Sequence, residues 1–130
     1  MSTILKVTGL TKHFPVAKKS FFGTAETVQA VDDVSFEIGA GEAVGLVGES
    51  GCGKSTTGRL ITRLIDPTSG SIEFDGEEIS NKDSKQLLSI RPKLQMIFQD
   101  PYASLNPRHT VGTIVSTPMR INGIKPEGGT

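Results

Sequence analysis

The chain has 130 residues, and its 14 basic and 14 acidic side chains cancel to a formal net charge of zero. This length fits one domain, and the balanced charge gives no electrostatic reason to expect nucleic acid or an anionic membrane as the main partner. The single cysteine cannot form an internal disulfide, and the sequence has no run of ~18 apolar residues of the kind that crosses a membrane. These features favour a globular domain of the cytoplasm.

Two segments near the N-terminus alternate apolar and polar residues, which is the pattern of half-buried β-strands. The first covers residues 4–10 and is expected to end at Pro15, and the second covers residues 28–38. Because these segments follow each other along the chain, they predict an antiparallel sheet. Phe21 and Phe22 lie in the loop between them, where they either form a small contact patch or pack onto their own domain.

An uninterrupted apolar run, Ala43–Val47, predicts a strand that is buried on both faces. A glycine-rich segment follows it. From Lys54 onward, apolar residues recur at helical spacing until Asp66 and Pro67 stop the pattern, so a helix is expected there. Its apolar face consists of Leu60, Ile61, Leu64 and Ile65.

The middle of the chain predicts a hairpin and a short helix. Ser71–Phe74 and Glu77–Ile79 are strand segments on either side of Asp75-Gly76, which is a strong two-residue turn signal. After this hairpin, Asp83 or Ser84 is expected to cap a short helix that extends through Ile90.

The last third of the chain predicts one more buried strand and one more helix. Leu94–Phe98 is a second apolar run of strand length. Thr110 is expected to cap a helix that ends before Pro118. Residues 123–130 show no periodicity and are expected to form a flexible tail.

Residues 48–55 read Gly-Glu-Ser-Gly-Cys-Gly-Lys-Ser and match the phosphate-binding pattern G-x-x-x-x-G-K-[ST]. Glycines are needed because backbone N–H groups converge on a phosphate only where the chain curls tightly and no Cβ obstructs it. The following helix points its N-terminal amides into the same space, Lys54 adds a positive charge, and the Ser55 hydroxyl can ligate Mg²⁺. The alternative, a glycine-rich turn with an incidental lysine, is disfavoured by the strand before the motif and the helix after it. The sequence therefore predicts a site for a nucleoside triphosphate.

Two longer stretches resemble a known family. Residues 44–56 and residues 95–108, the latter with a Pro-Tyr-x-Ser-Leu-Asn-Pro core, resemble the ATP-binding subunit of ABC transporters and, in particular, its dipeptide and oligopeptide import branch. The resemblance extends from about Leu5 to Asn122. It implies an α/β fold of the P-loop NTPase class, the core of the ABC nucleotide-binding domain, with an N-terminal antiparallel β subdomain. Residues 1–130 then correspond to the N-terminal part of that domain.

The resemblance also assigns roles to individual residues. Gln99 matches the Q-loop glutamine, whose amide ligates Mg²⁺ and orients the attacking water, and Phe14 matches the aromatic residue that stacks on adenine. Outside this family context, a loop glutamine is usually only solvated, and a phenylalanine at a strand end usually belongs to the core. Lys54 and Gln99 are the candidate catalytic residues, and Ser55 and Gln99 are the candidate Mg²⁺ ligands. The candidate ATP-binding residues are Phe14, Gly48, Glu49, Ser50, Gly51, Cys52, Gly53, Lys54, Ser55 and Thr56.

Several motifs that complete the ATP site of this family have no match in the printed sequence. The only Gly-Gly pair, Gly128-Gly129, follows Glu127 and not the serine of a Ser-Gly-Gly-Gln signature. No Asp-Glu pair follows an apolar strand, and neither His13 nor His109 ends one. We therefore expect the chain by itself to bind ATP weakly and not to turn it over.

The predicted function is the ATP-binding component of a peptide importer that couples ATP binding and hydrolysis to transport. The resemblance implies transmembrane permease subunits and a second ATP-binding subunit as partners, at the inner face of the cell membrane. A non-catalytic nucleotide-binding fragment that docks on a permease or a sibling subunit is the alternative. A nucleotide or small-molecule kinase shares the phosphate loop but needs a lid arginine cluster, whereas Arg59 and Arg63 are expected on the solvated face of the helix.

Overall fold

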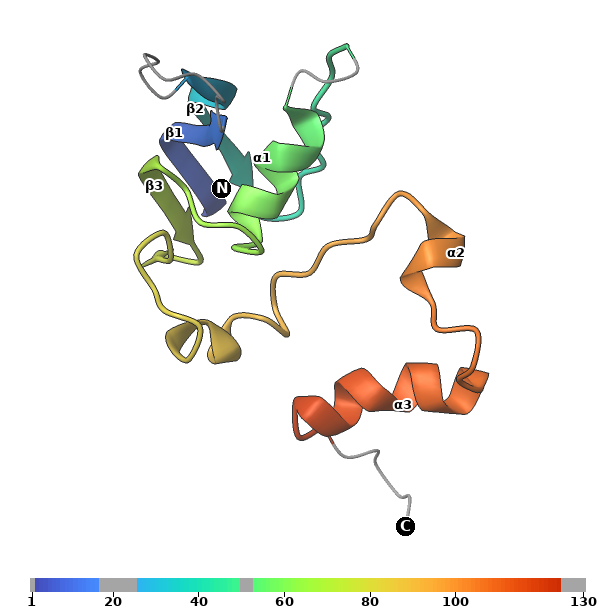
Figure 1. Ribbon diagram of the computed structural model, residues 1–130. Helices are drawn as coiled ribbons and strands as arrows, with labels where there is room; N and C mark the ends of the chain where they lie inside the picture. The colour runs from blue at the N-terminus through green and yellow to red at the C-terminus, as the bar shows by residue number, and fades with distance from the viewer. Residues whose placement is uncertain (1, 17–25, 50–52, 125–130) are drawn as a thin grey trace. The chain divides into compact units, whose positions relative to one another are not determined.

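The computed structural model describes residues 2–16, 26–49 and 53–124. They form two compact units, one up to Leu94 and one from Gln95 onward, and each is described by itself (Figure 1). Phe21, Phe22 and residues 125–130 of the expected tail lie outside the described residues. The expectations for those segments therefore stay predictions.

An antiparallel sheet of four strands forms the framework of the first unit, in the spatial order β2-β1-β3-β4. The strands are β1 (Thr3–Val16), β2 (Glu26–Gly39), β3 (Ser69–Phe74) and β4 (Glu77–Glu78). The predicted antiparallel sheet at the N-terminal end is therefore confirmed. The expectation that Pro15 ends the first strand is wrong, because Pro15 still pairs with Thr27 of β2. The pairing of β1 with β3 stops at Thr11, so Pro15 lies where its missing N–H costs no bond to a second neighbour.

The turn between β3 and β4 is the predicted two-residue hairpin. Asp75 has φ 50° and Gly76 has φ 79°, and left-handed values at both central positions are the requirement of a type I′ turn. Phe74 consequently pairs with Glu77 and Glu73 pairs with Glu78.

The core of the first unit lies where helix α1 (Lys54–Ile61) packs against the sheet (Figure 1). In β1, Leu5 and Val7 are buried whereas Lys6 between them is exposed, as the period of two predicts. From α1, Leu60 is completely buried. The buried apolar residues are Leu5, Val7, Leu10, Val31, Leu60, Ile72, Ile79, Leu87 and Ile90.

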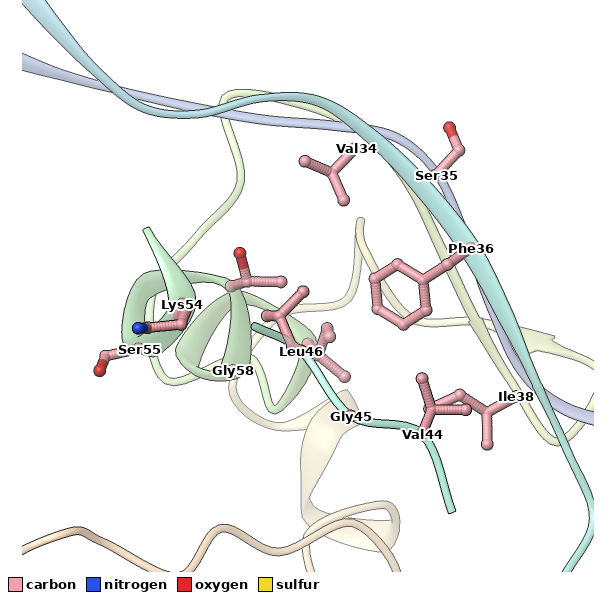
Figure 2. A pocket seen from close by; sticks show the side chains of 12 residues that line it. Val34, Ser35, Phe36, Ile38, Val44, Gly45, Leu46, Lys54, Ser55 and Gly58 are labelled. Carbon is pink, nitrogen blue, oxygen red and sulfur yellow. The ribbon is translucent and has the colours of Figure 1, made fainter. Parts of the chain in front are cut away.

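The apolar run 43–47 is not a strand in the structure, which makes that expectation wrong. A strand in a sheet needs a neighbour for its backbone N–H and C=O groups, and none of the four described strands pairs with this run. Val47 is 90% exposed. Val44 and Leu46 line an open hollow of about 630 Å³ together with Phe36 of β2, as Figure 2 shows.

Helix α1 ends at Ile61, a turn earlier than the sequence predicts. Arg63 adopts φ 55°, in the left-handed region that commonly terminates helices. Its N–H donates to the Leu60 carbonyl at 3.0 Å, and the N–H of Leu64 donates to the Arg59 carbonyl at 2.9 Å. These are the two hydrogen bonds of a Schellman motif, with arginine at the position where glycine is usual.

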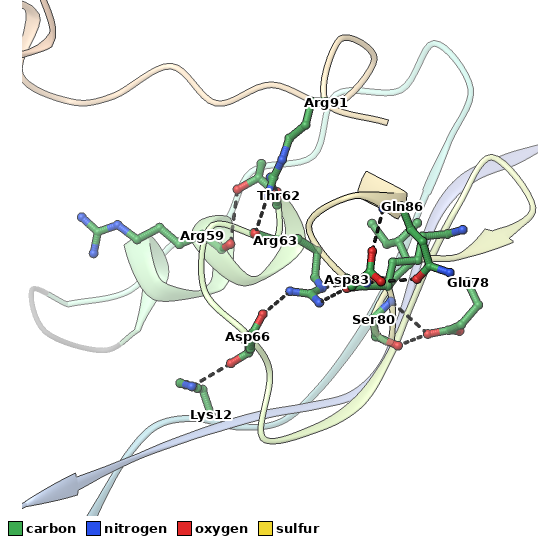
Figure 3. A network of polar contacts seen from close by, with 12 residues as sticks. Lys12, Arg59, Thr62, Arg63, Asp66, Glu78, Ser80, Asp83, Gln86 and Arg91 are labelled. Atoms are coloured by element: carbon green, nitrogen blue, oxygen red, sulfur yellow. Dashed lines mark hydrogen bonds and ion pairs between the residues drawn. The ribbon is translucent and has the colours of Figure 1, made fainter. Parts of the chain in front are cut away.

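The Arg63 side chain is buried, with only 6% of its surface exposed. Its Nε donates to the Ile79 carbonyl at 3.1 Å, its Nη2 to the Lys82 carbonyl at 2.7 Å, and its Nη1 to Asp66 Oδ1 at 2.5 Å (Figure 3). The expectation that Arg63 lies on a solvated helix face is therefore wrong, while Arg59 does lie exposed. The three bonds hold Arg63 in a backbone conformation that costs a non-glycine residue about 1 kcal/mol.

The short helix expected after Asp83 is a single turn of 3-10 helix, η1 (Gln86–Ser89), and does not extend through Ile90. The N-cap position of η1 is Lys85, which makes no side-chain cap bond, so neither Asp83 nor Ser84 occupies it. Asp83 still bonds to the first residue of η1: its Oδ1 accepts from the Gln86 N–H at 2.8 Å, and its own N–H donates to Gln86 Oε1 at 3.0 Å. Pro92 follows closely and prevents a longer helix.

The second unit contains α2 (Pro101–Ser104) and α3 (Val111–Ile121). Thr110 caps α3 as predicted, because its Oγ1 accepts from the Thr113 N–H at 3.2 Å. The expectation that α3 ends before Pro118 is wrong: the helix continues for another turn, which the Asn122 N–H closes on the Pro118 carbonyl at 3.1 Å.

The apolar run 94–98 is also not a strand, contrary to the prediction, and Ile97 is 98% exposed. Asp100 follows the run and caps α2, since its Oδ1 accepts from the N–H groups of Tyr102 and Ala103 at 2.9 and 3.1 Å. An apolar run without a neighbouring strand therefore does not become a strand here, while the cap, which needs only local atoms, forms.

Substitutions at Arg63 separate its backbone role from its side-chain role. Arg63→Gly tolerates the left-handed conformation but loses the three guanidinium bonds, so we expect the free energy of unfolding to fall by about 2 kcal/mol in urea titrations. Arg63→Ala also carries the backbone cost, so we expect a further loss of about 1 kcal/mol. The exposed Arg59→Ala is the matched control, with a change within about 0.5 kcal/mol. Equal stability of the alanine and glycine variants at position 63 would contradict this account.

Candidate functional site

The structure describes the first two residues of the phosphate-loop motif, Gly48 and Glu49, and its last three, Gly53, Lys54 and Ser55. Ser50, Gly51 and Cys52 lie outside the described residues, so their predicted roles rest on the sequence. The Lys54 ammonium donates a hydrogen bond to the Gly48 carbonyl. This contact links the two described ends of the motif.

Gly53 is held where no other residue fits. It has φ 93°, and a Cβ at this position would lie 2.1 Å from the carbonyl oxygen of Ala30 in β2. Its own carbonyl accepts from the N–H and the Oγ1 of the buried Thr57, both at 2.8 Å. Gly53, at the N-cap position of α1, is therefore in direct contact with the backbone of β2.

The first turn of α1 has the properties of an anion site. The N–H groups of Lys54, Ser55 and Thr56 have no carbonyl partner within the helix, because no helical residue lies four positions before them. The turn contains no acidic residue, and Gly53 provides no side-chain cap. The positive end of the helix dipole and the Lys54 charge add at the same place. Figure 2 shows the polar ends of Lys54 and Ser55 on the side of α1 away from Phe36.

Ser55 is exposed and Thr56 is half-buried in this first turn. The Ser55 hydroxyl is thus accessible to a cation that accompanies an anion at the helix N-terminus. A hydroxyl of this kind fits Mg²⁺, which prefers oxygen ligands and keeps several waters.

Phe14 lies on the same sheet, close to the contact that holds Gly53. It pairs with Val28 of β2, and Ala30 lies two residues further along β2. Two residues along a strand and one strand across correspond to roughly 8 Å between the backbones of Phe14 and Ala30. The Phe14 side chain is 39% exposed, so it is a surface residue and not part of the core.

Gln99 belongs to the second unit, where it is exposed in the bend before Asp100. Its predicted part in the site rests on the sequence.

Sequence reasoning missed two contributors to this region. Ala30 supplies the carbonyl that Gly53 packs against, and no local pattern could have identified it. The Lys12 ammonium lies 5.2 Å from the centre of the Phe14 ring. A basic residue two positions before an aromatic one, on the same face of a strand, is a signal that could have identified Lys12.

These features define the class of protein before any comparison. A glycine-rich segment precedes a helix, the Lys54 ammonium donates to the Gly48 carbonyl, and the helix N-terminus carries backbone donors and hydroxyls. This arrangement is the phosphate-binding loop of a P-loop nucleotide-binding domain.

Comparison with protein families is consistent with that class and makes it specific. A family model described as ABC transporter matches residues 31–125. The chain belongs to this family, as residues 44–56 and 95–108 predicted. Membership implies nucleotide binding and, for the family in general, ATPase activity. In the described part of the chain, no helix has the length and apolar character needed to cross a membrane.

Curated relatives match most of the chain. It is 51% identical over 116 residues to a probable peptide ABC transporter ATP-binding protein of Sinorhizobium fredii, a match that covers 89% of this chain and 33% of that protein. It is 56% identical over 106 residues to the oligopeptide transport ATP-binding protein OppF of Bacillus subtilis, with 81% of this chain and 35% of that protein covered. The chain therefore spans about a third of the length of these relatives.

A solved ABC cassette shares the fold. The dimeric post-hydrolysis state of the ATP-binding cassette MJ0796, bound to ADP and Pi, superimposes with a TM-score of 0.76 at 27% identity. The match covers 98% of this chain and 50% of that chain. The predicted α/β P-loop fold class is confirmed by this likeness.

A methyl group at Gly53 tests whether the contact with Ala30 orients the loop. Gly53→Ala must displace the loop from β2, so we expect nucleotide affinity in calorimetry to fall roughly tenfold or more, which corresponds to about 1.4 kcal/mol. Gly41→Ala is the matched control, because Gly41 also has a positive φ of 75° but nothing within 4 Å of an added Cβ. The control is expected to bind nucleotide as the wild type does. Unchanged affinity in Gly53→Ala would show that the contact is not needed.

Proposed function

We propose that the chain binds ATP with Mg²⁺ at its phosphate loop, as the nucleotide-binding part of a peptide importer. Two contacts support this most directly. Gly53 lies against the Ala30 carbonyl, and the Lys54 ammonium donates a hydrogen bond to the Gly48 carbonyl. Together they place the start of α1 so that its backbone donors and one positive charge are available to a phosphate group.

The phosphate-binding step uses groups that are already oriented. The N–H groups at the start of α1 point out of the helix, and Lys54 holds a neutral carbonyl as its acceptor. A phosphate oxygen would replace that carbonyl with a charge-assisted hydrogen bond, which is about twice as strong. Glu49 and the glycines Gly48, Gly51 and Gly53 complete the proposed loop, with Ser50, Cys52 and Thr56 at the remaining positions.

The adenine-binding step is assigned to Phe14. Its ring is partly exposed, and its strand position lies roughly 8 Å from the residue that supports Gly53. Base–aromatic stacking contributes about 1–3 kcal/mol. Phe14 can therefore hold the base while the phosphates lie at the helix N-terminus.

Ser55 and Gln99 are the proposed oxygen ligands of Mg²⁺, and Lys54 and Gln99 the proposed catalytic residues. When bound, the metal ion supplies charge stabilisation for the transferred phosphoryl group. Ser55 is exposed in the first turn of α1, which suits this role. The role of Gln99 is carried over from the family pattern of residues 95–108.

The transport function is assigned from the relatives, whose names describe peptide and oligopeptide transport. Residues 1–130 are proposed as the N-terminal part of the ATP-binding domain, with 123–130 as a tail, on the family resemblance of residues 44–56 and 95–108. Transmembrane permease subunits and a second ATP-binding subunit are the proposed partners, at the cytoplasmic face of the cell membrane.

Binding without turnover is the proposed behaviour of these 130 residues alone. The printed sequence has no Asp-Glu pair after an apolar strand and no Ser-Gly-Gly-Gln signature. A non-catalytic nucleotide-binding fragment that docks on a permease or a sibling subunit is the second candidate function.

Two substitutions test the nucleotide site. Lys54→Ala removes the ammonium and Phe14→Ala removes the stacking surface, so we expect each to weaken fluorescent ATP binding by roughly tenfold or more. Phe14→Tyr keeps an aromatic face and is expected to bind as the wild type does. Unchanged ATP affinity in Phe14→Ala would contradict the stacking role of Phe14.

A phosphate-release assay tests whether these 130 residues turn over MgATP by themselves. We expect no release above background from the purified chain with MgATP, because the groups that activate water are not in the printed sequence. Release that Lys54→Ala abolishes would show that the chain turns over by itself. Co-purification with permease subunits is expected under either function.

A further inference from the structure

Lys12 makes two contacts that the nucleotide site as described does not use. Its Nζ lies 5.2 Å from the centre of the Phe14 ring, within the range of a cation–π interaction. The same Nζ donates to the backbone carbonyl of Asp66 at 2.7 Å. Lys12 and Phe14 are two residues apart in β1, and side chains at that spacing share one face of a strand.

The acceptor of Lys12 is itself held firmly. Asp66 Oδ1 accepts from Arg63 Nη1 at 2.5 Å, and the Arg63 side chain is buried and bonded to the carbonyls of Ile79 and Lys82 (Figure 3). Arg91 also donates to the Thr62 and Arg63 carbonyls, at 2.5 and 2.9 Å. The ammonium is therefore fixed by a network that starts in the core and reaches the surface beside Phe14.

We propose that Lys12 is a positioning residue for the nucleobase, which holds the Phe14 ring by contact with one of its faces and leaves the other face for the base. The proposal rests on the nucleotide site proposed above. A partly exposed phenylalanine otherwise samples several rotamers, and a ring held in one orientation loses less freedom when a base stacks on it.

The contribution of Lys12 is specific to the base. The Lys12 contacts involve the Phe14 ring and a backbone carbonyl, whereas the phosphate-binding groups lie at the start of α1. A ligand that has phosphates but no base therefore does not depend on Lys12. A comparison of ATP with tripolyphosphate therefore isolates the contribution of Lys12.

The experiment measures the affinity of the full chain for MgATP and for magnesium tripolyphosphate by calorimetry. Lys12→Met keeps the length of the side chain and removes the charge, so we expect it to weaken ATP binding about two- to fivefold and leave tripolyphosphate binding unchanged. Lys12→Arg keeps a cation that can reach both the ring and the carbonyl and is expected to restore ATP binding. Lys6→Met is the matched control, because exposed Lys6 on the same strand pairs with Glu37 at 3.6 Å and is expected to change neither affinity.

A double-mutant cycle completes the test. In a Phe14→Ala background, Lys12→Met is expected to have no further effect on ATP affinity, since the ring through which it acts is gone. An equal loss for both ligands, an undiminished effect without Phe14, or no effect on ATP overturns the role of Lys12 while the nucleotide site stands. Wild-type protein that binds neither ligand overturns the nucleotide site and the role of Lys12 together.

Discussion

The contact between Gly53 and the Ala30 carbonyl is the constraint on which the site depends. A side chain at position 53 would overlap that oxygen, and the residue also needs φ 93°. Because Thr57 closes the first helical turn on the Gly53 carbonyl, one backbone position joins the loop, the helix and the sheet. The direction in which the helix N-terminus presents its donors follows from this joint and not from the loop alone.

The other end of α1 is held by a different kind of interaction. Arg63 terminates the helix in a left-handed conformation, and its guanidinium binds carbonyls after β4 and the carboxylate of Asp66. Asp66 in turn accepts from Lys12, which contacts the Phe14 ring. The same network of contacts therefore connects the helix that carries Lys54 with the strand that carries Phe14. In the proposed site, this network connects Phe14 with a loop about forty residues later in the sequence.

Interactions between near neighbours in the sequence were predictable. The Asp75-Gly76 turn and the Thr110 cap form as expected, because each needs atoms within three or four residues. The apolar runs 43–47 and 94–98 were predicted as strands and are not strands. A run of apolar residues indicates that a segment tends to be buried. A strand forms only where the backbone of a second segment donates to and accepts from its N–H and C=O groups. No described strand pairs with residues 43–47, and Val44 and Leu46 line an open hollow together with Phe36.

The sequence by itself determined the family, the phosphate-loop motif and the antiparallel N-terminal sheet, because spacing and residue type carry that information directly. Only the tertiary structure decided that Gly53 lies on Ala30, that α1 stops at Ile61, and that Arg63 is buried and linked to Lys12 through Asp66. The contacts of Arg63 with Ile79 and of Lys12 with Asp66 join residues that are 16 and 54 positions apart. No local pattern encodes them, since they exist only after the sheet and the helix have packed together.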